Sequence, residues 1–81
     1  MIEIYTTAHC PYCDRAKDIF KHKGLEYVEY RVDQDGEKRQ EMMTLSKRRT
    51  VPQIFINKHH VGGYDDLKAL IDAGEFEALF K

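Results

Sequence analysis

The chain has 81 residues, and its 13 Lys and Arg nearly balance 14 Asp and Glu, which gives a formal net charge of −1 at neutral pH. Residues 1–81 are expected to form a single domain with a small core. The balanced charge gives no support for nucleic-acid binding, and no apolar run is long enough to span a membrane. Met1 leads directly into a β-prone run without a signal-peptide pattern, which predicts a cytoplasmic protein.

The first third of the chain predicts a strand, a helix and a second strand. Residues 2–6 alternate and are β-prone, so they predict a first strand. Residues 11–23 carry apolar side chains at helical spacing and end in basic residues before Gly24, which predicts a helix with its C-cap. Residues 25–32 are rich in Tyr and Val and predict a second strand.

The middle of the chain predicts a charged helix followed by a third strand. The helix is expected over residues 37–46, with Met42, Met43 and Leu45 facing the core. A basic loop follows it. Residues 51–56 then predict a third strand that is opened by its proline.

The last quarter predicts a hairpin and two helices. Asn57-Lys58 is expected to turn the chain into a short fourth strand over residues 59–61. Tyr64 opens a third helix that ends before Gly74, and residues 75–79 predict a short final helix. The order βαβαββα with a last short helix predicts an α/β fold. Strands 1 and 2 are expected to be parallel because a helix joins them, and strands 3 and 4 antiparallel because a turn joins them.

The two cysteines of the chain lie where the first strand gives way to the first helix. Residues three apart in a helix share a face, so the sulfurs of Cys10 and Cys13 can meet. Pro11 suits the first helical position, and Cys10 just before it faces the free N–H groups and the positive end of the helix dipole. Since this environment favours the thiolate, Cys10 is the predicted nucleophile and Cys13 the resolving thiol.

Two plainer interpretations of the cysteine pair are weaker. A structural disulfide that closes so short a loop stabilises little, because the entropic gain grows with loop length. A structural zinc site needs about four ligands. His9, His59 and His60 would have to complete it, and they show no finger-like spacing. No metal site is therefore expected, and reversible disulfide chemistry is favoured.

Three motifs together resemble the glutaredoxin family, and within it the short dithiol class of the bacterial glutaredoxin 3 type. They are Cys10-Pro11-Tyr12-Cys13, Thr50-Val51-Pro52 and Gly62-Gly63-Tyr64-Asp65-Asp66. The resemblance covers essentially the whole chain. It implies a thioredoxin fold, with a four-stranded mixed sheet flanked by three main helices and a short C-terminal helix. It also implies glutathione as reductant and co-substrate, with no permanently bound cofactor.

The resemblance further implies a glutathione site. Its residues are Tyr12, Arg39, Thr50, Val51, Pro52, Gly63, Tyr64, Asp65 and Asp66. The bond before Pro52 is implied to be cis and to lie beside Cys10, which leaves the N–H and C=O of Val51 free to pair with a peptide-like ligand. The plainer alternative for Pro52 is a loop proline that starts an edge strand.

The third motif suits the γ-glutamyl end of such a ligand. Gly62 and Gly63 allow a close approach of backbone to ligand. Backbone N–H groups of Asp65 and Asp66 at a helix start suit a carboxylate, and an Asp side chain suits the ammonium. Asp65 is also expected to be the helix N-cap. Tyr64 has the alternative of a surface aromatic.

One position departs from the pattern of the family. Many relatives carry Lys or Arg three residues before the nucleophile, where this chain has Thr7. The resemblance leaves Arg39 to hold the glycine carboxylate alone, with Arg49 and His9 as possible substitutes. Arg48 is interpreted as part of a solvated basic face. Weaker glutathione binding than in relatives with the cation is expected.

The resemblance implies an enzyme that reduces protein disulfides and protein–glutathione mixed disulfides. A monomer is expected because the sequence shows no long apolar edge and no heptad pattern. Its partners would be glutathione and disulfide-containing or glutathionylated proteins. Two alternatives stay open. One is a glutaredoxin-like reductase that depends on thioredoxin reductase and lacks a glutathione pocket. The other is an iron–sulfur carrier dimer with glutathione as outer ligand, against which the rigid Pro11 argues.

Overall fold

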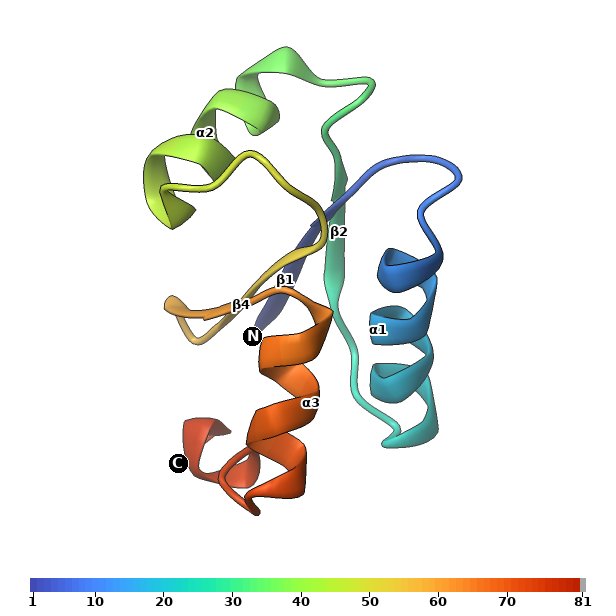
Figure 1. Ribbon diagram of the computed structural model, residues 1–81, viewed down its shortest axis with the longest axis vertical. Coiled ribbons are helices and arrows are strands. Elements are labelled where there is room, and N and C mark those ends of the chain that lie inside the picture. Colours follow the sequence, from blue (N-terminus) through green and yellow to red (C-terminus); the bar gives the residue numbers. More distant parts are fainter. Residues whose placement is uncertain (81) are drawn as a thin grey trace.

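The computed structural model describes residues 1–80 (Figure 1). In chain order its elements are β1 (Ile2–Thr6), α1 (Pro11–His22), β2 (Val28–Arg31), α2 (Gly36–Ser46), β3 (Gln53–Ile56), β4 (His59–Gly62), α3 (Tyr64–Asp72) and the 3-10 helix η1 (Glu77–Phe80). The predicted order of strands and helices is confirmed. Within residues 1–80 no helix has both the length and the apolar character needed to cross a membrane.

The four strands form one mixed sheet in the order β2-β1-β3-β4. β1 runs parallel to β2, with Glu3 opposite Val28. β1 and β3 are antiparallel, and so are β3 and β4. The predicted fold class and the predicted strand directions are therefore confirmed. The arrangement places the N-terminus of α1 and the segment before β3 at the same end of the sheet, because β1 and β3 are antiparallel neighbours.

Helices cover both faces of the sheet (Figure 1). On one face α1 and α3 pack against a mainly aliphatic cluster made of Ile2, Ile4, Ala16, Phe20, Ile54, Ile56, Leu67 and Phe76. On the other face α2 packs against a smaller cluster made of Tyr5, Val32, Met42 and Phe55. Because side chains alternate along a strand, β1 supplies both clusters, and all of its residues are buried.

Several predicted boundaries are wrong, and two of these differences have a local reason. β2 begins at Val28 rather than residue 25, because Val28 already pairs with Glu3 near the start of β1 and earlier residues find no partner strand. β3 begins at Gln53 rather than residue 51, since Pro52 has no N–H to donate to a neighbouring strand. The final helix is a 3-10 helix that begins at Glu77 rather than residue 75.

The inward face of α2 also differs from the prediction. Met42 is fully buried and Met43 is half-buried, but Leu45 is 56% exposed. Met42 and Ser46 lie four residues apart on the side that faces the sheet, so Leu45 is turned away from it. The predicted hairpin turn is confirmed, since Asn57 and Lys58 have φ values of 48° and 69° that suit a tight two-residue turn.

Candidate functional site

Cys10 and Cys13 form a disulfide at the start of α1, with their Cα atoms 5.2 Å apart. Cys10 is the N-cap residue and Pro11 is the first helical residue. The N–H of Cys13 donates to the sulfur of Cys10 over 3.2 Å. Cys10 is half-buried, whereas Cys13 is fully buried. A partner thiol or disulfide therefore reaches the Cys10 sulfur first, and the donated N–H favours a negative charge on that sulfur once the pair is reduced.

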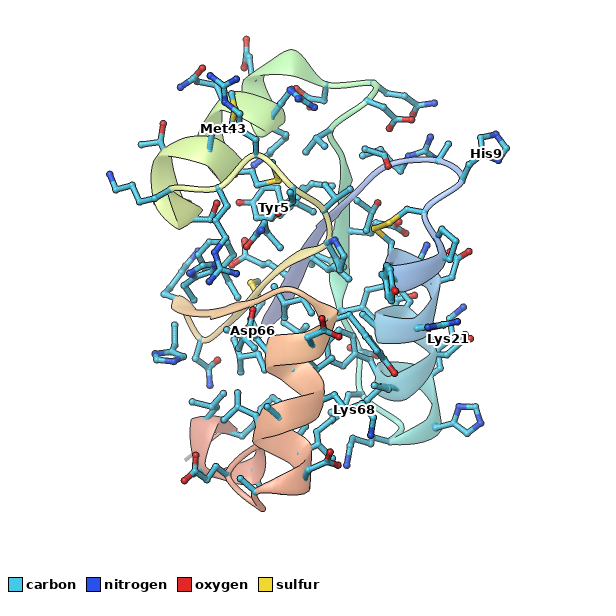
Figure 2. The ribbon with its side chains drawn as sticks, viewed as in Figure 1. Tyr5, His9, Lys21, Met43, Asp66 and Lys68 are labelled. Carbon is cyan, nitrogen blue, oxygen red and sulfur yellow. A yellow bond between two sulfur atoms is a disulfide. The ribbon has the colours of Figure 1, made fainter. Side chains whose placement is uncertain are left out.

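The loop that leads to Cys10 is tied to the end of β2 by Asp33. The Asp33 carboxylate accepts the N–H of Ala8 over 3.1 Å and two bonds from the Arg31 guanidinium over 2.8 and 2.7 Å. The bonds from Arg31, and then the Ala8 N–H, hold the pKa of Asp33 well below its usual range. His9, the next residue in the loop, has a φ of 56° and points away from the protein (Figure 2). This loop thus holds Cys10 in place without using His9.

A cavity of about 230 Å³ lies at the end of the sheet where α1 and α3 begin, and Tyr12, which stands between the two cysteines in the chain, lines part of it. It is lined by Tyr12, Arg48, Thr50, Val51, Pro52, Gln53, Gly63, Tyr64, Asp65 and Asp66. The structure therefore brings together the three sequence motifs, which lie far apart in the chain. Of the residues that the resemblance implies for ligand binding, only Arg39 lies elsewhere, on the exposed side of α2.

The wall of the cavity at Val51 presents free backbone. The Val51–Pro52 peptide bond is cis, as the resemblance implies. In the part of the chain from residue 1 to 80, neither the N–H nor the C=O of Val51 makes a hydrogen bond. An extended peptide-like ligand can pair with these two groups in the manner of an added strand.

The wall at the start of α3 has its own hydrogen-bond arrangement. Gly63 is the N-cap, so the expectation that Asp65 caps the helix is wrong. The Asp66 carboxylate reaches back to accept the Gly63 N–H over 2.9 Å and also binds Arg48 over 3.0 Å. A carboxylate at the third helical position can accept the N–H of the N-cap residue. Asp65, by contrast, is exposed and lines the cavity. The Gly63 N–H and then Arg48 lower the pKa of Asp66.

Gly62, which precedes this N-cap, is required for a different reason than the expected approach of a ligand. Gly62 has a φ of 118°, and a Cβ atom there would overlap the Asp66 carboxylate. Gly62 is therefore needed to accommodate the chain's own Asp66 rather than a ligand. At Gly63 an added Cβ would lie 3.5 Å from the Pro52 carbonyl oxygen, so this glycine lies directly beside the second motif.

Two residues of the site were missed by the sequence analysis. Arg48, interpreted as solvated, lines the cavity and forms the ion pair with Asp66. Gln53 also lines it and is only 1% exposed. The one available signal for Gln53 was a polar residue inside an otherwise apolar strand pattern. Arg48 gave no such signal, because its partner lies 18 residues further along the chain.

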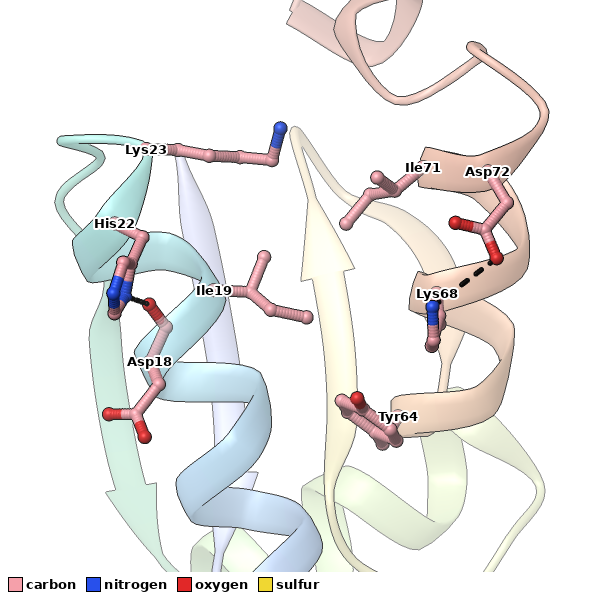
Figure 3. Close-up of a pocket in the computed structure, with 8 residues that line it drawn as sticks. All are labelled: Asp18, Ile19, His22, Lys23, Tyr64, Lys68, Ile71 and Asp72. Carbon is pink, nitrogen blue, oxygen red and sulfur yellow. Dashed lines mark hydrogen bonds and ion pairs between the residues drawn. The ribbon is translucent and has the colours of Figure 1, made fainter.

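A larger groove of about 560 Å³ lies between α1 and α3 (Figure 3). Ile19 and Ile71 face each other across it, and Tyr64 lies at one end. Tyr64 is the only residue that it shares with the cavity beside the cysteines. The ring of Tyr64 lies 5.8 Å from the ring of Tyr12, so the two tyrosines mark the boundary between the groove and the reactive site.

Residues 1–80 contain no group of three or more His, Cys, Asp and Glu side chains placed to hold a metal ion. What the site offers is a reactive cysteine pair, free strand-like backbone and a first helical turn of α3 whose N-cap residue has no side chain. Because Gly63 has no side chain, no cap side chain occupies the N–H groups of that turn, which can therefore receive an anion.

Comparison with known proteins gives a consistent result. The glutaredoxin family model matches residues 2–61. Glutaredoxin 3 of Escherichia coli strain K12 is 49% identical over 80 residues, which cover 99% of this chain and 96% of the relative.

Two solved structures are also similar. The solution structure of glutaredoxin from Brucella melitensis has a TM-score of 0.82 at 49% identity, and the match covers 96% of this chain and 85% of the other. The crystal structure of a buckwheat glutaredoxin–glutathione complex has a TM-score of 0.87 at 26% identity, and covers 96% of this chain and 74% of the other. The fold is thus the thioredoxin fold. With its Cys10–Cys13 disulfide, this thiol–disulfide oxidoreductase belongs to the glutaredoxin family.

Proposed function

We propose that this protein is a glutathione-dependent oxidoreductase that reduces protein disulfides and protein–glutathione mixed disulfides. The observation that carries the proposal is the cavity beside the cysteines, in which the free N–H and C=O of Val51 lie near the start of α3, where the N-cap Gly63 has no side chain. These groups match a short peptide with a carboxylate at its end. The similar buckwheat protein, which was solved as a glutathione complex, adds support.

Glutathione would bind in this cavity through groups at both walls. Its cysteine pairs with the Val51 backbone, and its γ-glutamyl carboxylate accepts N–H groups at the start of α3. The Asp65 side chain is exposed and suits the ammonium, whereas the Asp66 carboxylate is already engaged by Gly63 and Arg48. Tyr12 and Tyr64 would cover the sulfur end, and Arg39, which lies on α2 outside the cavity lining, remains the proposed partner of the glycine carboxylate.

Reduction of a glutathione mixed disulfide needs Cys10 alone. The Cys10 thiolate attacks the glutathione sulfur, the protein–glutathione S–S bond breaks, and the substrate thiolate leaves and takes a proton from water. A second glutathione thiolate then attacks the sulfur of the glutathione held on Cys10. Oxidised glutathione leaves, and Cys10 returns as a thiolate stabilised by the Cys13 N–H.

Reduction of a protein disulfide needs both cysteines. Cys10 attacks one sulfur of the substrate and forms a mixed disulfide, and one substrate thiolate leaves. Cys13 then attacks the Cys10 sulfur, which releases the second substrate thiol and gives the Cys10–Cys13 disulfide seen in the structure. Two glutathione molecules reduce that disulfide and leave as oxidised glutathione. The burial of Cys13 suits a thiol that acts only inside the protein.

We further propose a setting for this activity. A reactive cysteine pair that is reduced in each cycle fits a reducing compartment, which favours the cytoplasm. The chain would act as a monomeric single domain, with disulfide-containing or glutathionylated proteins as its macromolecular partners. It would hold no permanent cofactor, because glutathione enters and leaves as a co-substrate.

A coupled assay tests the proposal. NADPH consumption is measured with glutathione, glutathione reductase and the glutathione–mercaptoethanol mixed disulfide, and in parallel with thioredoxin reductase in place of the glutathione system. Turnover with glutathione and not with thioredoxin reductase is expected. Turnover with thioredoxin reductase alone would mean that the cavity is not a glutathione site. A preparation without either activity but with visible absorbance under anaerobic conditions would instead indicate an iron–sulfur carrier.

A further inference from the structure

The buried Gln53 side chain connects β4 to the wall of the cavity. Its Nε2 lies 3.0 Å from the carbonyl oxygen of Thr50 and 3.2 Å from Thr50 Oγ1, while its Oε1 lies 2.8 Å from Nε2 of His60. The Thr50 carbonyl oxygen can only accept a hydrogen bond, so the NH₂ of Gln53 must face Thr50. The Gln53 oxygen then faces His60, and this oxygen too can only accept.

This geometry fixes which ring nitrogen of His60 carries a proton. Its Nε2 must carry a proton in order to donate to Gln53, so the neutral ring is the Nε2–H tautomer. The ring packs against Phe55 with its centroid 4.9 Å from that of the phenyl ring. Burial, and then the nearby positive charge of Arg48, lower the pKa of His60, which keeps the ring neutral at neutral pH.

We propose that His60 is a positioning residue for the reaction, and that it acts through Gln53 on the Thr50–Val51 segment. This segment carries the backbone that would pair with glutathione, and the Gln53–Thr50 bonds hold it next to β3. Without the His60 donor, the Gln53 oxygen would be buried and unpaired, so the amide would turn and release the Thr50 carbonyl. This role deepens the proposed function and rests on it.

The first test separates hydrogen bonding from packing. His60→Phe keeps a ring against Phe55 but has no N–H, whereas His60→Gln places an amide N–H near the position of Nε2. His59 is exposed on the same strand, and His59→Phe is the matched control. In His60→Phe the KM for the glutathione–mercaptoethanol mixed disulfide is expected to rise about five-fold, with kcat within about two-fold, as for one lost hydrogen bond.

The conservative variant decides the interpretation. In His60→Gln, KM is expected to stay within about two-fold of the wild-type value, since the donor is restored. Equal KM values for His60→Phe and His60→Gln would overturn the positioning role, and so would a fall of kcat at unchanged KM. A wild-type protein without glutathione-dependent turnover would instead contradict the proposed function.

The second test does not depend on activity, and its deciding measurement is made on the wild-type protein. Long-range ¹H–¹⁵N spectra of the imidazole rings report which nitrogen carries the proton. In the wild-type protein above the pKa of His60, the Nε2–H tautomer is expected, and Gln53→Leu should weaken that preference. A wild-type His60 protonated on Nδ1 would overturn the inference, whatever the kinetics show.

Discussion

The cysteine pair and the cavity beside it are built in different ways. The reactive part is four consecutive residues, 10–13, and the start of α1 directs the Cys13 N–H to donate to the Cys10 sulfur. The cavity is assembled from three separated segments, and contacts such as the Arg48–Asp66 ion pair hold them together. We therefore expect the reactivity of Cys10 to depend on local helix geometry, and the affinity for glutathione to depend on the whole fold. Substitutions in the cysteine motif should therefore change kcat, whereas substitutions in the cavity should change KM.

The largest effect is expected from Cys10→Ser. Both the reduction of protein disulfides and the removal of glutathione should fall more than about a hundred-fold, because each of the two proposed routes begins with attack by the Cys10 sulfur. The measurement is the coupled NADPH assay with both kinds of substrate. A Cys10→Ser protein that still removes glutathione would mean that the nucleophile is wrongly assigned.

A substitution at the cavity should act on affinity instead. In Asp66→Ala the Gly63 N–H and Arg48 both lose their acceptor, so the start of α3 loosens. KM for the glutathionylated substrate should rise about ten-fold with kcat within about two-fold, and the free energy of unfolding should fall by about 1 kcal/mol. Steady-state kinetics and urea unfolding measure the two effects.

The control for this variant is Asp72→Ala, which removes a carboxylate at the other end of α3. Its KM should equal that of the wild-type protein. If Asp66→Ala lowers kcat without raising KM, then the cavity and the cysteine pair do not act separately.

A smaller effect is expected at Thr7, where the family resemblance implies a cation in many relatives. Thr7→Lys should lower the KM for the glutathionylated substrate about three-fold, since a lysine there attracts the glycine carboxylate. The gain should shrink as salt is raised. Thr7→Gln adds similar length without charge and should leave KM unchanged. An unchanged KM in Thr7→Lys would refute the view that Thr7 weakens binding.

The smallest effect concerns acid stability. The Gly63 N–H and then Arg48 lower the pKa of Asp66, so the ionised carboxylate stabilises the folded protein above its unfolded pKa of about 3.9, and this contribution is lost as the pH falls further. Because the side chain is 48% exposed, the contribution should be below about 1 kcal/mol. Urea unfolding at about pH 6 and pH 2.5 should show a larger loss for wild type than for Asp66→Asn. Equal losses would contradict the assignment.

The sequence was sufficient where local rules decide the structure. Residue spacing predicts Cys10 just before α1, turn residues predict the hairpin at Asn57, and alternation predicts the order of strands and helices along the chain. It was insufficient where a side chain can choose between partners. Arg48 was interpreted as a solvated cation because nothing in the sequence pattern links it to Asp66. Asp65 was expected to be the N-cap because the hydrogen bond from the Gly63 N–H to Asp66 depends on the backbone conformation at Gly62.

The most direct test of the separation between chemistry and recognition is the Cys13→Ser protein. It is assayed with glutathione and glutathione reductase, first on the glutathione–mercaptoethanol mixed disulfide and then on a protein disulfide. Because Cys10 alone completes the first reaction in the proposed mechanism, turnover on the mixed disulfide should stay within about three-fold of wild type, while reduction of the protein disulfide should be lost. Loss of both reactions would show that the buried Cys13 is needed for every turnover, and would contradict the assignment of the first reaction to Cys10 and the cavity alone.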